Sequence, residues 1–156
     1  MTDQEASEDR SRVEIGSDGP STILVAADGS PTAQHALAYA AGLARRQHAR
    51  LLVVYVRQPP AIISTDACVA ALAQQTHDQI QAQLREVVQS ELIPQGIDAR
   101  LVTCTGEPAH ALADVAARAH ADVIVVGAST NRRHRIAGSI PTRLVRHAHW
   151  PITVVP

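Results

Sequence analysis

The sequence predicts an α/β fold: one domain built on a doubly wound, five-stranded parallel sheet with helices on both faces. Three observations lead to this prediction. Short apolar runs alternate with stretches of helical periodicity, in the order βαβαβαβαβ. Strands that alternate with helices form parallel sheets, because each helix crosses over between two strands. The length of 156 residues fits one domain, which buries roughly two-thirds of its unfolded surface.

Five apolar runs are the predicted strands, and each ends at turn residues, at prolines or at the end of the chain. The third run alternates apolar and polar residues, which is typical of a strand near the sheet edge. The fourth run is continuously apolar, which indicates a central strand. The five runs are 23–27, 51–56, 97–104, 122–127 and 152–155.

Four stretches repeat apolar residues at helical spacing. Ser30 caps the first helix and Pro31 takes its first position, Gly-Glu-Pro at 106–108 starts the third, and Ser139 caps the last. Pro-Gln-Gly at 94–96 ends the second, which begins near Asp66. The predicted apolar faces are Ala33, Leu37, Ala40 and Ala44; then Val69, Leu72, Ala73, Ile80, Leu84, Val88 and Leu92; then Ala109, Leu112, Ala116 and Ala119; and finally Ile140, Leu144, Val145 and Ala148.

Composition excludes several classes of function. The chain has 14 basic and 15 acidic residues, so neither nucleic acid nor an anionic membrane is expected as the main partner. It has no Phe, one Trp and two Tyr, which argues against base stacking. Cys68 and Cys104 lie far apart, and the histidines show no ligand spacing, so we expect neither a disulfide scaffold nor a transition-metal site.

We expect neither a secretory signal nor a transmembrane helix in this sequence. Residues 1–21 are polar and acidic, with too little apolar content to fold, and we expect a disordered tail before a domain at 22–156. No apolar stretch approaches the roughly 20 residues that span a bilayer. The sequence therefore predicts a cytoplasmic protein.

Two polar loops follow strands that look central. Asp28-Gly-Ser follows the first, and Gly127 to Ser139 follows the fourth, with a basic run at 132–135 between them. If the two strands are neighbours, both loops face the crevice where α/β proteins bind ligands. Both loops also fit plainer interpretations. Asp28 is then a turn residue that accepts a hydrogen bond from its own backbone, and the basic run is a solvated surface.

The combination resembles the universal stress protein family over residues 22–156. The residues that carry the resemblance are Ile-Leu-Val-Ala-Ala-Asp-Gly-Ser at 23–30, Leu-Val-Val-Tyr-Val at 52–56, Gly-Glu-Pro at 106–108, Asp-Val-Ile-Val-Val-Gly at 122–127, Gly-Ser-Ile at 138–140 and Trp-Pro-Ile-Thr-Val-Val at 150–155. The resemblance implies a strand order of 3-2-1-4-5 and a homodimer that pairs through the last strand, residues 152–155.

The resemblance also implies an ATP site. By position, Asp28 would contact the adenosine, and the backbone of Val56 would receive the adenine. Ribose and phosphates would lie at Gly127, Gly138, Ser139 and Ile140, with Mg²⁺ held mainly by phosphate and water. This chain departs from the family pattern at Thr130, which replaces a second glycine, and in a shorter interval of seven residues before Gly138.

Three functions are consistent with these observations. The first is an adenine-nucleotide-binding stress regulator, the second a slow ATPase that uses the same site, and the third a dimeric interaction module without a ligand. No nucleophile with a neighbouring base is visible along the sequence, which favours binding and regulation over catalysis.

Overall fold

The computed structural model describes residues 19–59, 67–128, 140–147 and 149–156. Most of the predicted tail, residues 1–18, lies outside the described residues. The elements along the chain are β1 (Thr22–Ala26), α2 (Pro31–Gln47), β2 (Arg50–Arg57), α3 (Ala67–Val87), β3 (Ala99–Thr105), α4 (Pro108–Ala119), β4 (Val123–Gly127), α6 (Ile140–His147) and β5 (Ile152–Val155).

All five strands join one parallel sheet in the order β3-β2-β1-β4-β5, so the predicted fold class and strand order are confirmed. The chain winds from β1 to β2 and β3 on one side of the sheet, then returns to place β4 and β5 on the other. β1 is central because it is apolar on both faces: Ile23, Leu24 and Val25 are each fully buried. β3 lies at the edge, as its alternating pattern predicts.

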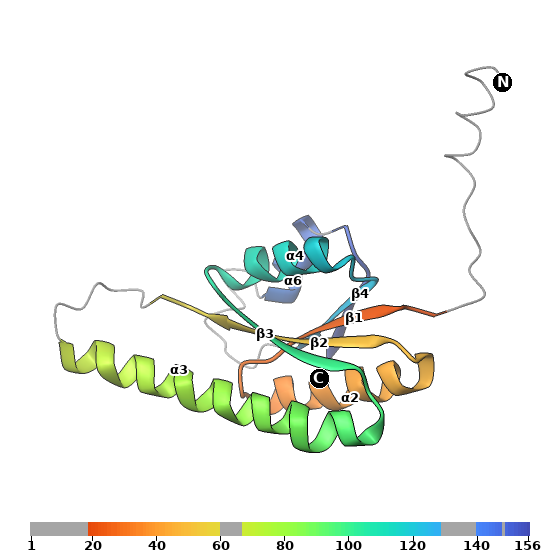
Figure 1. The fold of residues 1–156 in the computed structure, drawn as a ribbon. Helices are drawn as coiled ribbons and strands as arrows, with labels where there is room; N and C mark the ends of the chain where they lie inside the picture. Colours follow the sequence, from red (N-terminus) through yellow and green to blue (C-terminus); the bar gives the residue numbers. More distant parts are fainter. Residues whose placement is uncertain (1–18, 60–66, 129–139, 148) are drawn as a thin grey trace.

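The helices cover both faces of the sheet, α2 and α3 on one and α4 and α6 on the other (Figure 1). Successive residues of β1 point to opposite faces, so Ile23 and Val25 pack under α2 while Leu24 packs under α4. The predicted inner face of α2 is confirmed in full: Ala33, Leu37, Ala40 and Ala44 are buried. Its alanines have small side chains, which lets the helix backbone lie close to the strands.

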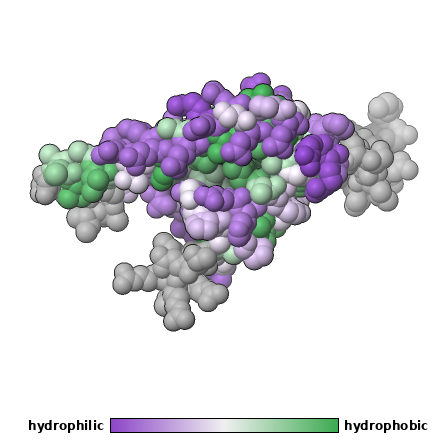
Figure 2. Space-filling model, turned by 90° about the horizontal axis from the view of Figure 1, so that it is seen from below, coloured by the Kyte–Doolittle hydropathy of each residue, from purple (hydrophilic) through white to green (hydrophobic). Residues whose placement is uncertain are grey.

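The second predicted helix is longer than the surface it covers. Leu84, Val88 and Leu92 are buried as predicted, but Val69 is 51% exposed and Leu72 is 65% exposed, so their predicted burial is wrong. The first turns of α3 extend past the strands of the sheet, which therefore do not cover them (Figure 1). Figure 2 shows this end of α3 as an apolar patch at the left of the molecule.

The helix after β4 needs a similar correction. Leu144 is buried against the sheet and Ile140 is partly buried, but Val145 is 65% exposed. An eight-residue helix makes about two turns, and one narrow face is enough to hold it on the sheet. Ala148, also predicted on the inner face, lies outside the described residues.

Irregular turns join α3 to β3. A turn of π-helix spans Val88–Leu92 and a 3-10 turn spans Ile93–Gln95. Gly96 follows with a φ of 80°, a left-handed conformation that costs glycine little. The predicted stop at 94–96 is therefore found. In the described part of the chain, no helix is long and apolar enough to cross a membrane.

Candidate functional site

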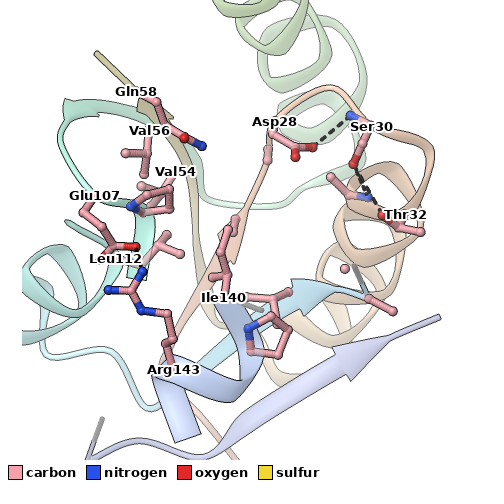
Figure 3. Close-up of a pocket in the computed structure, with 18 residues that line it drawn as sticks. Asp28, Ser30, Thr32, Val54, Val56, Gln58, Glu107, Leu112, Ile140 and Arg143 are labelled. Atoms are coloured by element: carbon pink, nitrogen blue, oxygen red, sulfur yellow. Dashed lines mark hydrogen bonds and ion pairs between the residues drawn. The ribbon is translucent and has the colours of Figure 1, made fainter. Parts of the chain in front are cut away.

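A cavity of about 460 Å³ opens at the carboxyl ends of β1, β2 and β4 (Figure 3). The first residues of α2, α4 and α6 complete its walls. In a parallel sheet, each crossover helix starts at the carboxyl end of a strand, so several helix N-termini converge here. β1 and β4 are neighbours, but from β1 the chain continues toward β2 and from β4 it continues toward β5. The cavity therefore lies where the sequence predicts the crevice.

Asp28 follows β1 and lies on the cavity wall. Its Oδ1 accepts a hydrogen bond from the Ser30 N–H at 2.9 Å, which is the turn interaction that the plainer interpretation predicts. The residue is nevertheless exposed and borders the cavity, so the turn fixes the carboxylate in a position where a ligand can reach it. The two interpretations of Asp28 are therefore compatible.

Ser30 is the N-cap of α2, as predicted. Its Oγ accepts the Ala33 N–H at 3.2 Å and lies 3.4 Å from the Thr32 hydroxyl. Pro31 occupies the first helical position, where its missing N–H costs nothing. The cap itself is uncharged, and the Asp28 carboxylate lies beside it at the positive end of α2, through its bond to the Ser30 N–H.

Val56 lies near the end of β2 and borders the same cavity. The register of β1 with β2 ends at the pair Ala26 and Val54, and the Val54 carbonyl accepts the Ala27 N–H at 2.9 Å. Alternate residues of a parallel strand bond to the same neighbour, so the Val56 main chain faces the β1 side, beyond the last paired residue. Its N–H and C=O are therefore directed toward the cavity rather than toward a strand.

Gly127 ends β4 and also borders the cavity, and the packing around it leaves no room for a side chain. A Cβ at this position would lie 2.6 Å from the Thr32 carbonyl carbon, 2.7 Å from its oxygen and 2.9 Å from the Ala33 nitrogen. All three atoms belong to the backbone of α2 and cannot move aside like a side chain. The close approach that demands glycine at this position is therefore made by the backbone of α2.

Ile140, the first residue of α6, is the fourth predicted site residue that the structure brings to the cavity. Thr130, Gly138 and Ser139 lie outside the described residues, as does the basic run at 132–135. Asp28, Val56, Gly127 and Ile140 come from four separate segments of the chain, and the fold gathers them around one opening.

The site also contains two charged residues that sequence reasoning missed. Glu107 caps α4 with its carboxylate, and Arg143 Nη1 of α6 lies 2.9 Å from Glu107 Oε1. Figure 3 shows both on the wall opposite Asp28. Glu107 stands directly before a helix-starting proline, and this signal marks a cap. Arg143 follows Ile140 by three residues, which places both on one helix face.

A half-buried polar contact joins β2 to α3. The Tyr55 hydroxyl is 2.5 Å from His77 Nδ1 and links β2 to α3. Burial raises the pKa of the Tyr55 phenol; Arg57 lowers it, and the carboxylates of Asp28 and Asp78 raise it further. The phenol therefore stays protonated at neutral pH and is able to donate to the imidazole.

The charges of the described cavity wall are mixed. Asp28 and Glu107 are acidic, and Arg143 is the one basic residue among the described lining residues. No group of three or more His, Cys, Asp or Glu residues that could hold a metal ion is found within the part of the chain that the structure describes. This arrangement offers carboxylate acceptors, main-chain groups and one guanidinium to a polar ligand of nucleotide size.

Comparison with known proteins places the chain among relatives of the same size. A universal stress protein of Bacillus subtilis, YxiE, is 26% identical over an alignment of 144 residues that covers 85% of this chain and 97% of that protein. UspA from Lactobacillus plantarum superposes with a TM-score of 0.69 at 27% identity, covering 87% of this chain and 97% of its own. A universal stress protein family member from Burkholderia pseudomallei reaches a TM-score of 0.66 at 30% identity, covering 87% and 96%.

More distant structures share the fold and were solved with nucleotides. A universal stress protein in complex with cAMP is 23% identical, with a TM-score of 0.62 over 89% of this chain and 98% of that one. An Arabidopsis thaliana member with AMP bound is 18% identical, with a TM-score of 0.64 over 87% and 91%. The family model of the universal stress proteins matches residues 20–156 of this sequence. The chain therefore belongs to the universal stress protein family.

Proposed function

We propose that this protein binds an adenine nucleotide, ATP first of all, in the cavity at the carboxyl ends of β1, β2 and β4, and acts as a stress-response regulator in the cytoplasm. One observation carries the proposal: Asp28 and Val56 lie on facing walls of one cavity (Figure 3). Relatives with the same fold were solved with cAMP and AMP, which supports an adenine nucleotide as the ligand class.

In this proposal each wall has its own task. Asp28 accepts hydrogen bonds from the adenosine, and the main chain of Val56, which is directed toward the cavity, receives the adenine edge. Gly127, Thr130, Gly138, Ser139 and Ile140 hold the ribose and the phosphates. The positive N-termini of α2 and α6 favour the phosphate charge, and Mg²⁺ would be held mainly by phosphate oxygens and water.

The experiment is direct. Freshly purified protein is denatured and its released small molecules are identified by mass spectrometry, and calorimetry then titrates stripped protein with ATP, AMP and GTP in the presence of Mg²⁺. We expect retained adenine nucleotide and tighter binding of ATP than of GTP. Stripped protein that binds no adenine nucleotide at millimolar concentration would refute the proposal and favour the ligand-free interaction module.

We further propose that the protein is a homodimer paired through β5. β5 lies at the sheet edge, and its alternate residues bond to β4: the carbonyls of Pro151 and Val155 accept N–H groups from that side. The main chain of Val154 therefore faces outward, and its side chain is 46% exposed. Two-fold pairing would satisfy both copies with one isologous contact.

Light scattering tests the dimer. Val154→Pro removes one outward N–H without touching the β4 pairing, so we expect it to weaken association while the fold persists. Wild-type protein that is monomeric at tens of micromolar would contradict the proposed dimer.

A further inference from the structure

The cavity has one feature that the proposed function leaves unused, the ion pair between α4 and α6. Arg143 Nη1 lies 2.9 Å from Glu107 Oε1, and the two side chains are 46% and 39% exposed. In Figure 3 the guanidinium reaches from α6 toward the Glu107 carboxylate. A pair with this much solvent contact contributes little to folding stability. Its position on the wall of the cavity calls for another explanation.

The ion pair is not needed to hold Glu107 in place, but it determines where the Arg143 guanidinium points. The Glu107 carboxylate is already held by α4, because Oε1 accepts the Ala109 N–H at 3.1 Å and Oε2 accepts the His110 N–H at 3.0 Å. Arg143 carries five N–H donors, and the bond to Glu107 uses one of them. Glu107 is therefore a fixed anion, whereas the guanidinium can turn to another acceptor without disturbing the α4 cap.

The charge on the cavity wall indicates what that acceptor is. Without Arg143, a phosphate in the cavity would meet the carboxylates of Asp28 and Glu107 and no cation among the described lining residues. Arg143 stands about one turn from Ile140, at the end of α6 where the helix dipole favours an anion. The planar fork of arginine also matches phosphate oxygens better than an ammonium does.

We propose that Arg143 binds the phosphate part of the nucleotide and that Glu107 competes with the phosphate for it. This inference rests on the proposed function, nucleotide binding in this cavity, and adds the residue that reads the ligand's charge. Phosphate groups attract the guanidinium away from Glu107, and a ligand with more phosphate charge does so more strongly. The pair therefore favours ATP over AMP, and AMP over adenosine.

The first test compares ligands that differ only in phosphate. Arg143→Gln removes the positive charge from a half-exposed side chain, and calorimetry measures adenosine, AMP and ATP on both proteins. We expect ATP affinity to fall about tenfold, AMP affinity to fall less, and adenosine affinity to stay within about twofold. The matched control is Arg146→Gln, which removes a charge from an exposed residue of the same helix that does not line the cavity. Thermal unfolding verifies that both variants fold.

The second test concerns the competition. Glu107→Gln keeps an oxygen that can accept an α4 N–H but removes the negative charge. We expect this substitution to raise ATP affinity about threefold to tenfold in the wild-type background and to have a smaller effect when combined with Arg143→Gln. An equal gain in both backgrounds would mean that the Glu107 charge repels the phosphate directly and not through Arg143. That result would overturn the proposed competition for Arg143.

The outcomes separate the inference from the proposed function. If wild-type protein binds neither adenosine nor ATP, the proposed function fails. If wild-type protein binds ATP but Arg143→Gln leaves its affinity unchanged, or lowers adenosine and ATP affinity equally, Arg143 is not the phosphate residue and the inference fails while the function stands.

Discussion

Asp122 and Asp28 stand at opposite ends of the same pair of strands, and the fold uses their carboxylates differently. Asp122 precedes β4, and its Oδ2 accepts three hydrogen bonds: from the Ser21 N–H at 2.8 Å, the Ser21 hydroxyl at 3.0 Å and the Thr22 N–H at 2.8 Å. Asp28 follows β1 and accepts one N–H, within its own turn. One carboxylate joins the starts of two strands, and the other is presented to a cavity.

The difference follows from the direction of the strands. At their amino ends β1 and β4 begin side by side, so a residue that precedes one strand reaches the first N–H groups of the other. At their carboxyl ends the chain departs into helices on opposite faces, and a crevice opens between them. Polar groups at the amino edge hold the sheet together, whereas polar groups at the carboxyl edge are available for a ligand.

The largest effect on stability is expected from Gly127→Val, at the carboxyl end of the β1–β4 strand pair. The new side chain would have to displace the Thr32 and Ala33 backbone atoms, which lie less than 3 Å from the point that a Cβ would occupy. We expect the free energy of unfolding to fall by about 3 kcal/mol, measured by urea denaturation.

Gly42→Ala is the matched control, because Gly42 lies inside α2 and its new Cβ would meet only the end of the flexible Arg46 side chain, at 3.3 Å. We expect a gain of about 0.5 to 1 kcal/mol from helix propensity. Equal losses in the two variants would contradict the close contact between β4 and α2.

The next largest effect on stability is expected at the amino ends of β1 and β4. Asp122→Ala removes the acceptor of three hydrogen bonds, and we expect it to cost about 2 kcal/mol of unfolding free energy. Asp28→Ala removes one turn bond and should cost about 0.5 kcal/mol. Urea denaturation of both variants checks the contrast, and similar costs would break the comparison between the two aspartates.

The reverse order is expected for nucleotide binding. Asp28→Ala should weaken adenosine and ATP alike by about tenfold, because it removes a carboxylate acceptor from the cavity. Asp122 lies at the amino ends of the strands, away from the cavity, so Asp122→Ala should leave both affinities within about twofold. Calorimetry on the folded variants provides the measurement. A larger loss of affinity in the Asp122 variant would contradict the division between the two edges.

The smallest effect is a pH dependence at Asp122. Partial burial raises the pKa of this carboxyl, but hydrogen bonds from the Thr22 amide and from the hydroxyl and amide of Ser21 lower it more, so the net pKa lies below its usual value. The unfolded chain therefore takes up the proton first as pH falls, and the stability that Asp122 contributes above its unfolded pKa is lost as pH falls through the folded pKa.

The Asn side chain in Asp122→Asn does not titrate, so this variant tests whether the stability contributed by Asp122 falls as pH falls. We expect the difference in unfolding free energy between wild type and Asp122→Asn to shrink when urea denaturation is repeated at pH 6 and then below pH 4. A difference that stays constant over this range would show that the Asp122 pKa is not lowered in the folded protein.

Local sequence was sufficient for the elements and for much of the core. The spacing of Ala33, Leu37, Ala40 and Ala44 predicts the inner face of α2, and all four are buried. The same spacing failed at Val69, because a helical repeat indicates which residues share a face but not how far the sheet beneath them extends. The sequence also placed Asp28, Val56, Gly127 and Ile140 at the site through a resemblance, without the geometry that joins them.

The sequence by itself determined the fold class and the five strands, because apolar runs of this length between helical repeats leave few other ways to bury their side chains. Only the tertiary structure decided which residues distant in the sequence contact one another. Asp28 and Asp122 both flank apolar runs and look alike in sequence, yet the Ser21 and Thr22 donors reach only Asp122. Gly127 meets α2, and Arg143 meets Glu107, because chain crossovers bring together residues whose contacts no local pattern records.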